Sequence, residues 1–156
     1  VYEKVFHNNR KFLAGGVDLL NKKLSFSLLY REGKGYDRYF KGPMIDLIFK
    51  PMRGLAFAFS ADQVHLENPQ TKETQTVGLN RIDYQLTNDA SIRLIFQTNL
   101  SEKTRYYSFS SLLTYRFLFG STAYLAYNEE RSKEVGMNSP KVNRLALLKI
   151  SYLFSF

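Results

Sequence analysis

Two histidines and a few carboxylates are the side chains of this sequence that could carry proton-transfer chemistry. His65 lies close in sequence to Asp62 and Asp83, and together they could form a hydrolase-type site; the other histidine is His7. However, Asp62 and His65 are offset by an odd number of positions, which places them on opposite faces of a strand. The sequence also lacks a Gly-Xaa-Ser-Xaa-Gly motif, a phosphate-binding loop and histidines at metal-ligand spacing. We therefore predict no enzyme, with no catalytic residues, no metal site and no cofactor.

A second set of charged residues alternates with large apolar side chains. If the chain forms a barrel, these charges project into its interior, where they either line a pore or pair with one another and fill the interior. The predicted lumen-facing charges are Arg31, Arg81, Arg93, Arg116, Asp46, Asp62 and Asp83, joined by Lys149.

The elements that must position these charges are β-strands, because apolar residues recur at every second position along the chain. Phe57 and Phe59, for example, alternate with Ala58 and Ser60. We predict about ten strands in a single domain, residues 1–156, with no linker. Their ranges are Val1–Phe6, Lys11–Leu19, Lys23–Arg31, Met44–Lys50, Gly54–Glu67, Thr74–Leu86, Ser91–Leu100, Arg105–Phe119, Ser121–Asn128 and Asn143–Phe156. In Thr74–Leu86 the apolar residues change from odd to even positions, which predicts a bulge near Asn80.

Short turns alternate with longer polar connections, as in outer-membrane barrels. Three features favour lipid over a soluble core as the surroundings of the apolar face. The polar face carries mainly Ser, Thr, Ala and isolated charges; the 13 Phe and 11 Tyr exceed what a small barrel can enclose; and most segments match the 9–11 residues of a membrane-crossing strand. The fold class is therefore all-β: an antiparallel transmembrane barrel in the outer membrane of a Gram-negative bacterium. A soluble barrel or sandwich is the alternative.

The chain ends in KISYLFSF, Lys149–Phe156. This segment resembles the C-terminal assembly signal of outer-membrane barrels, with Ser151 where that signal prefers Gly. The residues that carry the resemblance are Lys149, Ser151, Tyr152, Phe154 and Phe156. It implies that the barrel assembly machinery captures this strand by edge pairing.

A wider resemblance covers roughly the second half of the chain. NRIDYQLTNDASIRLIFQTNL (80–100), SSLLTYRFLFGSTAYLAYNE (110–129) and LLKISYLFSF (147–156) are similar to the C-terminal barrel region of outer-membrane proteins that carry an N-terminal family 9 carbohydrate-binding-like module. The shared features include an Arg-x-x-x-Gln strand at Arg93 and Gln97, and Tyr124, Tyr127 and Asn128. The resemblance implies that this chain is the C-terminal part of a larger barrel, although about ten strands could also close by themselves.

The segment Glu32–Pro43, EGKGYDRYFKGP, is predicted to be an extracellular loop that binds a ligand. Its cations and aromatic rings suit sugars, lipopolysaccharide phosphates or a partner protein, and the alternative is a loop whose rings lie at the membrane interface. The candidate residues are Lys34, Tyr36, Arg38, Tyr39, Phe40 and Lys41. The net charge of +8 comes without any nucleic-acid-binding motif, so no nucleic acid is expected as a partner.

The leading functional hypothesis is a membrane anchor or platform for surface glycan binding or handling. A porin-like channel for small solutes and an outer-membrane hydrolase are the alternatives. The expected partners are the lipid bilayer, lipopolysaccharide, the barrel assembly machinery, and glycans or other surface glycan-handling proteins.

Overall fold

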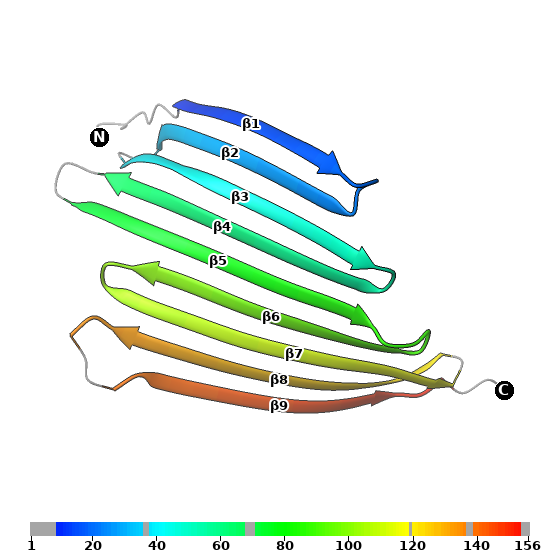
Figure 1. The fold of residues 1–156 in the computed structure, drawn as a ribbon. Coiled ribbons are helices and arrows are strands. Elements are labelled where there is room, and N and C mark those ends of the chain that lie inside the picture. Colours follow the sequence, from blue (N-terminus) through cyan, green and yellow to red (C-terminus); the bar gives the residue numbers. More distant parts are fainter. Residues whose placement is uncertain (1–8, 36–37, 68–70, 119, 137–138, 154–156) are drawn as a thin grey trace, which may run out of the picture.

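The computed structural model describes residues 9–35, 38–67, 71–118, 120–136 and 139–153, and these residues form one antiparallel sheet. The strands are β1 (Asn9–Leu19), β2 (Leu24–Gly35), β3 (Arg38–Met52), β4 (Leu55–Glu67), β5 (Lys72–Gln85), β6 (Ala90–Ser101), β7 (Thr104–Leu118), β8 (Ser121–Glu134) and β9 (Lys141–Ser151). Each strand pairs with the next along the chain, so the sheet is a meander (Figure 1). None of the described residues form a helix long and apolar enough to cross a membrane.

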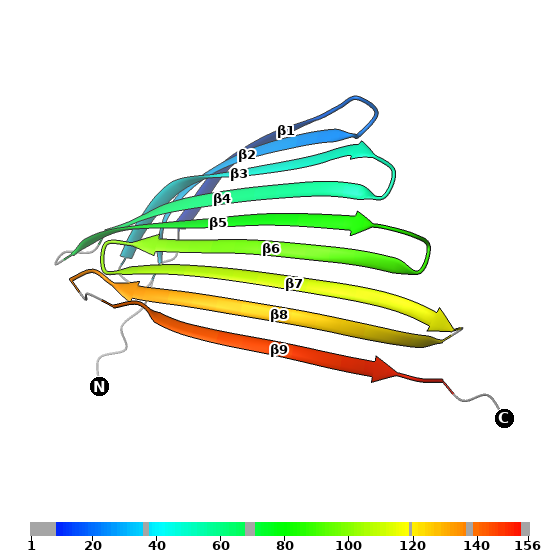
Figure 2. The ribbon, with the colours of Figure 1, turned by 60° about the horizontal axis from the view of Figure 1, so that its bottom comes forward.

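The predicted all-β class is confirmed, and nine of the predicted strands correspond to the nine strands observed. The first predicted strand, Val1–Phe6, lies outside the described residues. Figure 2 shows that the sheet is curved, with β1 and β2 turning behind β3 and β4. Among the described strands, β1 and β9 each pair with one neighbour and form the two edges of the sheet.

The prediction of a long loop at Glu32–Pro43 was wrong. β2 continues to Gly35 and β3 begins at Arg38, so most of this segment is a paired hairpin. The physical reason is that a polar sequence does not prevent main-chain pairing, and cross-strand partners here attract one another. Glu32 lies opposite Lys41 in the ladder, and the Tyr39 hydroxyl donates a hydrogen bond to the Glu32 carboxylate at 3.3 Å.

The bulge predicted near Asn80 is also absent. β5 keeps one continuous register with β4 and with β6 through this position, and the irregularities of the described ladders lie at Phe49/Met52 and Arg116/Leu118. The shift in the apolar pattern therefore reflects a change in composition on the two faces of β5. Val77 and Leu79 lie on the face that is mostly polar, and Asn80 lies between Phe59 and Phe96 on the other.

Cross-strand partners share a face of a sheet, so the register divides the side chains into two sets. The aromatic face includes Phe26, Leu28, Leu47, Phe57, Phe59, Ile92, Leu94, Phe96, Phe109, Leu113, Leu125, Leu148 and Ile150. The polar face includes Ser25, Ser27, Ala58, Ser60, Gln75, Gln97, Asn99, Ser108, Ser110, Asn128 and the predicted lumen charges. On most strands the aromatic face is apolar near the short turns and becomes charged towards the other end; β6, which ends at Thr98 and Leu100 on this face, is an exception.

The described residues contain no buried apolar side chain. Phe26, Phe59 and Phe96 are about as exposed as each other, at 39%, 40% and 42%. Their neighbours Ser27 and Ser60, on the polar face, are less exposed. This is the reverse of a water-soluble sheet, in which the large apolar side chains pack against a second layer.

The turn between β7 and β8 holds the end of the chain that follows β9. Ser121 is 1% exposed, and its hydroxyl accepts a hydrogen bond from the main-chain N–H of Leu153 at 3.2 Å. Gly120 has a φ of +75°, and a Cβ at this position would lie 2.9 Å from the Leu153 Cβ. The tight turn and the close approach both require glycine.

We expect Gly120→Ala to lower the free energy of unfolding by roughly 1–2 kcal/mol, because an L-residue is strained at this φ and its methyl group would displace Leu153. The control is Gly15→Ala, where a Cβ would meet no atom within 4 Å. The measurement is urea unfolding of the detergent-solubilised protein, monitored by far-UV circular dichroism, which needs no tryptophan. Equal stability of the two variants would contradict the prediction.

Candidate functional site

The polar face gathers the charged residues that the sequence singled out. The register places Arg31, Arg81, Arg93, Arg116, Asp46, Asp62, Asp83 and Lys149 on this one face. The alternation of side chains along β2 to β9 is what brings them together, because each follows or precedes an aromatic-face residue.

Several of these charges form ion pairs. Arg31 on β2 reaches across β3 to Asp62 on β4, whereas Asp83 on β5 pairs with Arg81 on its own strand and with Arg93 on the adjacent β6. Arg31 contacts Asp62 at 2.6 Å. The Asp83 carboxylate forms ion pairs with two guanidinium groups, those of Arg81 at 2.8 Å and Arg93 at 2.5 Å. Arg116, Lys149 and Asp46 form no ion pair within the described part of the chain. The eight residues are five cations and three carboxylates, so together they carry a positive excess.

A hollow of about 650 Å³ opens on the polar face where β1 to β4 end away from the short turns. Arg10, Arg31 and Arg38 line it, together with the rings of Phe12 and Phe40. The Nε atom of Arg31 is buried and has no hydrogen-bond partner among the described residues. The chemistry of this hollow, three guanidinium groups beside apolar surface, favours an anion that also has an apolar side.

The residues predicted for a ligand loop are divided between the two faces. Arg38 and Phe40 lie on the polar face, in the hollow just described. Lys34, Tyr39 and Lys41 lie on the aromatic face, and Tyr36 is outside the described residues. Sequence reasoning missed Arg10 and Phe12, which the pairing of β1 with β2 brings to this end. The sequence shows that Arg10 and Phe12 lie on the same face of a strand, but it does not show which strand pairs with β1.

The residues considered for hydrolysis are not brought together. Asp62 is paired with Arg31 on the polar face, whereas a ring nitrogen of His65 lies 2.9 Å from the Thr74 hydroxyl on the aromatic face. His7 lies outside the described residues. Among the residues that the structure places, no group of His, Cys, Asp and Glu could hold a metal ion.

The C-terminal motif is partly described. Lys149 and Ser151 lie on the polar face, and the ring of Tyr152 lies 6.3 Å from that of Phe117. Phe154 and Phe156 fall outside the described residues.

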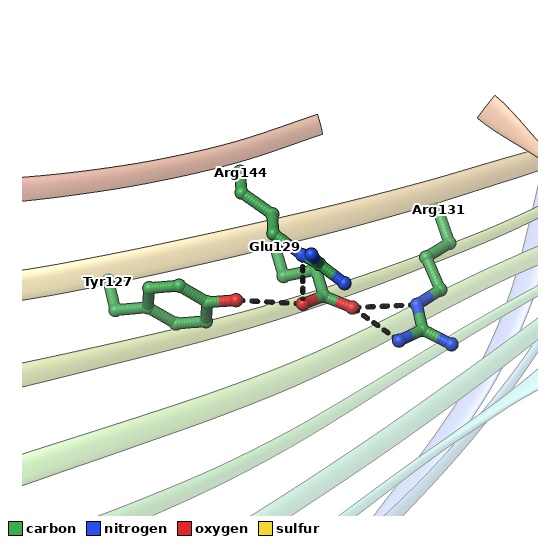
Figure 3. Close-up of polar contacts among 4 residues, drawn as sticks. All are labelled: Tyr127, Glu129, Arg131 and Arg144. Atoms are coloured by element: carbon green, nitrogen blue, oxygen red, sulfur yellow. Dashed lines mark hydrogen bonds and ion pairs between the residues drawn. The ribbon is translucent and has the colours of Figure 1, made fainter. Parts of the chain in front are cut away.

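A charged cluster that the sequence did not indicate lies on the aromatic face, where β8 and β9 leave the apolar region (Figure 3). The Glu129 carboxylate accepts hydrogen bonds from the Tyr127 hydroxyl at 2.7 Å, from Arg131 at 2.6 Å and from Arg144 at 2.9 Å. These three donors stabilise the ionised form of the carboxylate. The sequence indicates only part of this cluster. Glu129 and Arg131 are two positions apart on one strand and so share a face, but Arg144 comes from the next strand.

The fold and this distribution of side chains define a class of protein: an open antiparallel meander with one aromatic face and one charged face. No protein-family model matches the sequence, and no curated protein matches it. Among solved structures, the chain is similar to one described as "KdgM porin in complex with disordered oligogalacturonate". The identity is 10%, the match covers 96% of this chain and 97% of that chain, and the TM-score is 0.36.

Proposed function

We propose that this chain forms the wall of an outer-membrane barrel and that its charged face lines a channel for small solutes, with a preference for anions. The observation that carries the proposal is the inverted distribution of side chains. Large apolar side chains such as Phe26, Phe59 and Phe96 are exposed on one face, whereas small polar residues of the other face, such as Ser27 and Ser60, are less exposed. Lipid is the solvent that stabilises the first set, and a water-filled interior suits the second.

The lengths of the apolar stretches support this placement. On β4 the aromatic face is apolar at Leu55, Phe57, Phe59 and Ala61, and turns polar at Gln63. This stretch covers seven residues, and on β7 the corresponding stretch covers nine, from Tyr107 to Tyr115, which reaches the roughly 9–11 that a tilted strand needs to cross a bilayer. The charged ends of the strands would then stand in the headgroup region or in water.

The edges of the sheet place a condition on this proposal. Main-chain groups cannot stay unpaired in hydrocarbon, so the outer edges of β1 and β9 need partners. Successive strands are antiparallel, so β1 and β9 run in the same direction. An antiparallel closure therefore takes an odd number of further strands between them, whether from a longer chain or from another subunit.

A preference for anions follows from the charges of the polar face. Arg116 and Lys149 stay without carboxylate partners among the described residues, and Arg10 and Arg38 add to the positive field in the hollow at the strand ends. Rows of fixed charge along a pore raise the local concentration of the opposite ion.

A membrane anchor or platform for surface glycan handling is the second candidate. The specific observation in its favour is the pairing of Arg31 with Asp62 and of Asp83 with two arginines, because such pairs can also fill the interior of a non-conducting barrel.

Conductance across a planar lipid bilayer tests the channel. We expect discrete channels whose reversal potential in a salt gradient shows anion preference, and we expect Arg116→Glu to lower the anion-to-cation permeability ratio by about twofold or more. The matched control is Lys133→Glu, which changes the same charge on the aromatic face and should leave selectivity unchanged. A silent protein that still migrates as a heat-modifiable band after detergent extraction would exclude the channel and favour the anchor.

A further inference from the structure

On β7 to β9 the aromatic face turns from apolar to charged along the strands. Phe96, Phe109, Glu129 and Arg144 are successive cross-strand partners and form one row. In the next row Tyr107 lies opposite Arg131, and in the row beyond Arg105 lies opposite Lys133. Four cations and one carboxylate thus border the apolar region; we name this set the rim cluster: Arg105, Arg131, Lys133, Arg144 and Glu129.

A hollow of about 410 Å³ reaches into the apolar region beside the rim cluster, and Glu129 is among its lining residues whereas Arg144 is not. Its lining combines the rings of Phe96, Tyr107 and Phe109 with Arg105, Arg131 and Lys133. The apolar side of the hollow faces the short-turn ends of the strands and the cationic side faces away from them. A ligand that matches it has an anionic head and an apolar tail.

Glu129 orients two of the cations and leaves them able to bind more. Its side chain is 17% exposed, whereas the side chains of Arg131 and Arg144 are 58% and 61% exposed. Each guanidinium carries five N–H donors, and only part of them point at Glu129 (Figure 3). The remaining donors are available to a further anion, and the cluster keeps a positive excess.

We propose that the rim cluster binds the phosphate groups of a membrane glycolipid, the phosphorylated disaccharide of lipopolysaccharide, with an acyl chain against Phe96 and Phe109. Forked guanidinium groups match phosphate oxygens in geometry as well as in charge. A lipid fits better than a free anion because the cluster lies directly at the border of the apolar face. This inference rests on the proposed membrane placement.

Binding of lipid A in mild detergent tests the inference. The probes are bisphosphorylated lipid A, the same lipid without phosphates, and inorganic phosphate, each titrated against the full chain. We expect the bisphosphorylated lipid to bind at least tenfold more tightly than the other two. We also expect the double change Arg131→Gln with Arg144→Gln to weaken its binding about tenfold or more, because two charge-assisted contacts are lost.

The matched control removes two cations from the aromatic face away from the rim cluster, with Lys11→Gln and Lys72→Gln. This variant should bind like the unchanged protein. Equal weakening by the control, equal binding of the lipid without phosphates, or equally tight binding of inorganic phosphate would each overturn the inference. Failure of the membrane placement gives a different result, a protein that stays in solution without detergent.

Discussion

Replacing Phe59 with arginine should remove most of the folded, membrane-inserted protein, whereas the same replacement at Ser60 should be tolerated. Phe59 is in the middle of the apolar stretch of β4, between Leu47 and Asn80 on the neighbouring strands. An arginine near the midplane on the lipid side of a barrel costs about 2–4 kcal/mol, because its charge cannot be solvated there. That cost is a large part of the stability of a single domain.

Ser60 is the matched control because it is the next residue on the same strand and points to the opposite face. It lies opposite Asp46, so an arginine introduced there gains an attractive neighbour. The measurement is the fraction of protein that is heat-modifiable and protease-resistant in the outer membrane, followed by urea unfolding in detergent.

The comparison also separates the membrane interpretation from the soluble one. Phe59 is 40% exposed, so a sheet surrounded by water would accept arginine at this position with little loss. If Phe59→Arg and Ser60→Arg accumulate equally as folded protein, the aromatic face does not contact lipid. The proposed function, which requires that contact, would then be wrong.

Deleting Phe156 should leave secretion to the periplasm intact and strongly reduce the amount of protein assembled in the membrane. The reason is that the terminal motif supplies the strand edge and the aromatic side chains by which the assembly machinery is expected to hold the chain. Phe156 lies outside the described residues, so the structural support comes from the residues before it. The ring of Tyr152 lies beside Phe117, and Leu153 is bonded to Ser121, which aligns the end of β9 with the β7–β8 turn.

The edge of β9 is the reason why the chain is expected to need the assembly machinery. Within the described residues β9 pairs only with β8, and its aromatic face carries the exposed side chains of Leu148 and Ile150. An unpaired apolar edge aggregates unless it is covered before closure. Phe156→Tyr is the control and should assemble normally because it keeps the terminal ring. Normal membrane levels of the deletion variant, measured by pulse labelling and fractionation, would count against the assembly-signal interpretation.

Much of the fold could be predicted from the sequence because strand patterning is local. Side chains alternate across a strand, so the positions of Phe57, Ser60 and Arg93 in the sequence already indicate which residues share a face. The same alternation separated Asp62 from His65, and the register agrees with that separation. The short turns were recognisable from their position between two alternating segments.

The ends of the strands could not be predicted in the same way. Glu32 and Lys41 are polar, and polarity favours a loop in a sequence read alone, but they stabilise the hairpin once β2 and β3 are paired. At Asn80 the apolar pattern shifts without a bulge, because β4 and β6 hold β5 in register through their main-chain hydrogen bonds. Both errors arose from neighbours that the sequence does not show.

By itself, then, the sequence determined the strand class and the separation of an aromatic from a charged face, because both depend on the geometry of one strand. Only the tertiary structure decided which charges meet. Arg81 and Arg93 share Asp83, and Arg144 joins Arg131 at Glu129, since contacts between strands depend on register. The two hollows, one beside Arg10 and Arg38 and one beside Arg105 and Arg131, depend on it for the same reason.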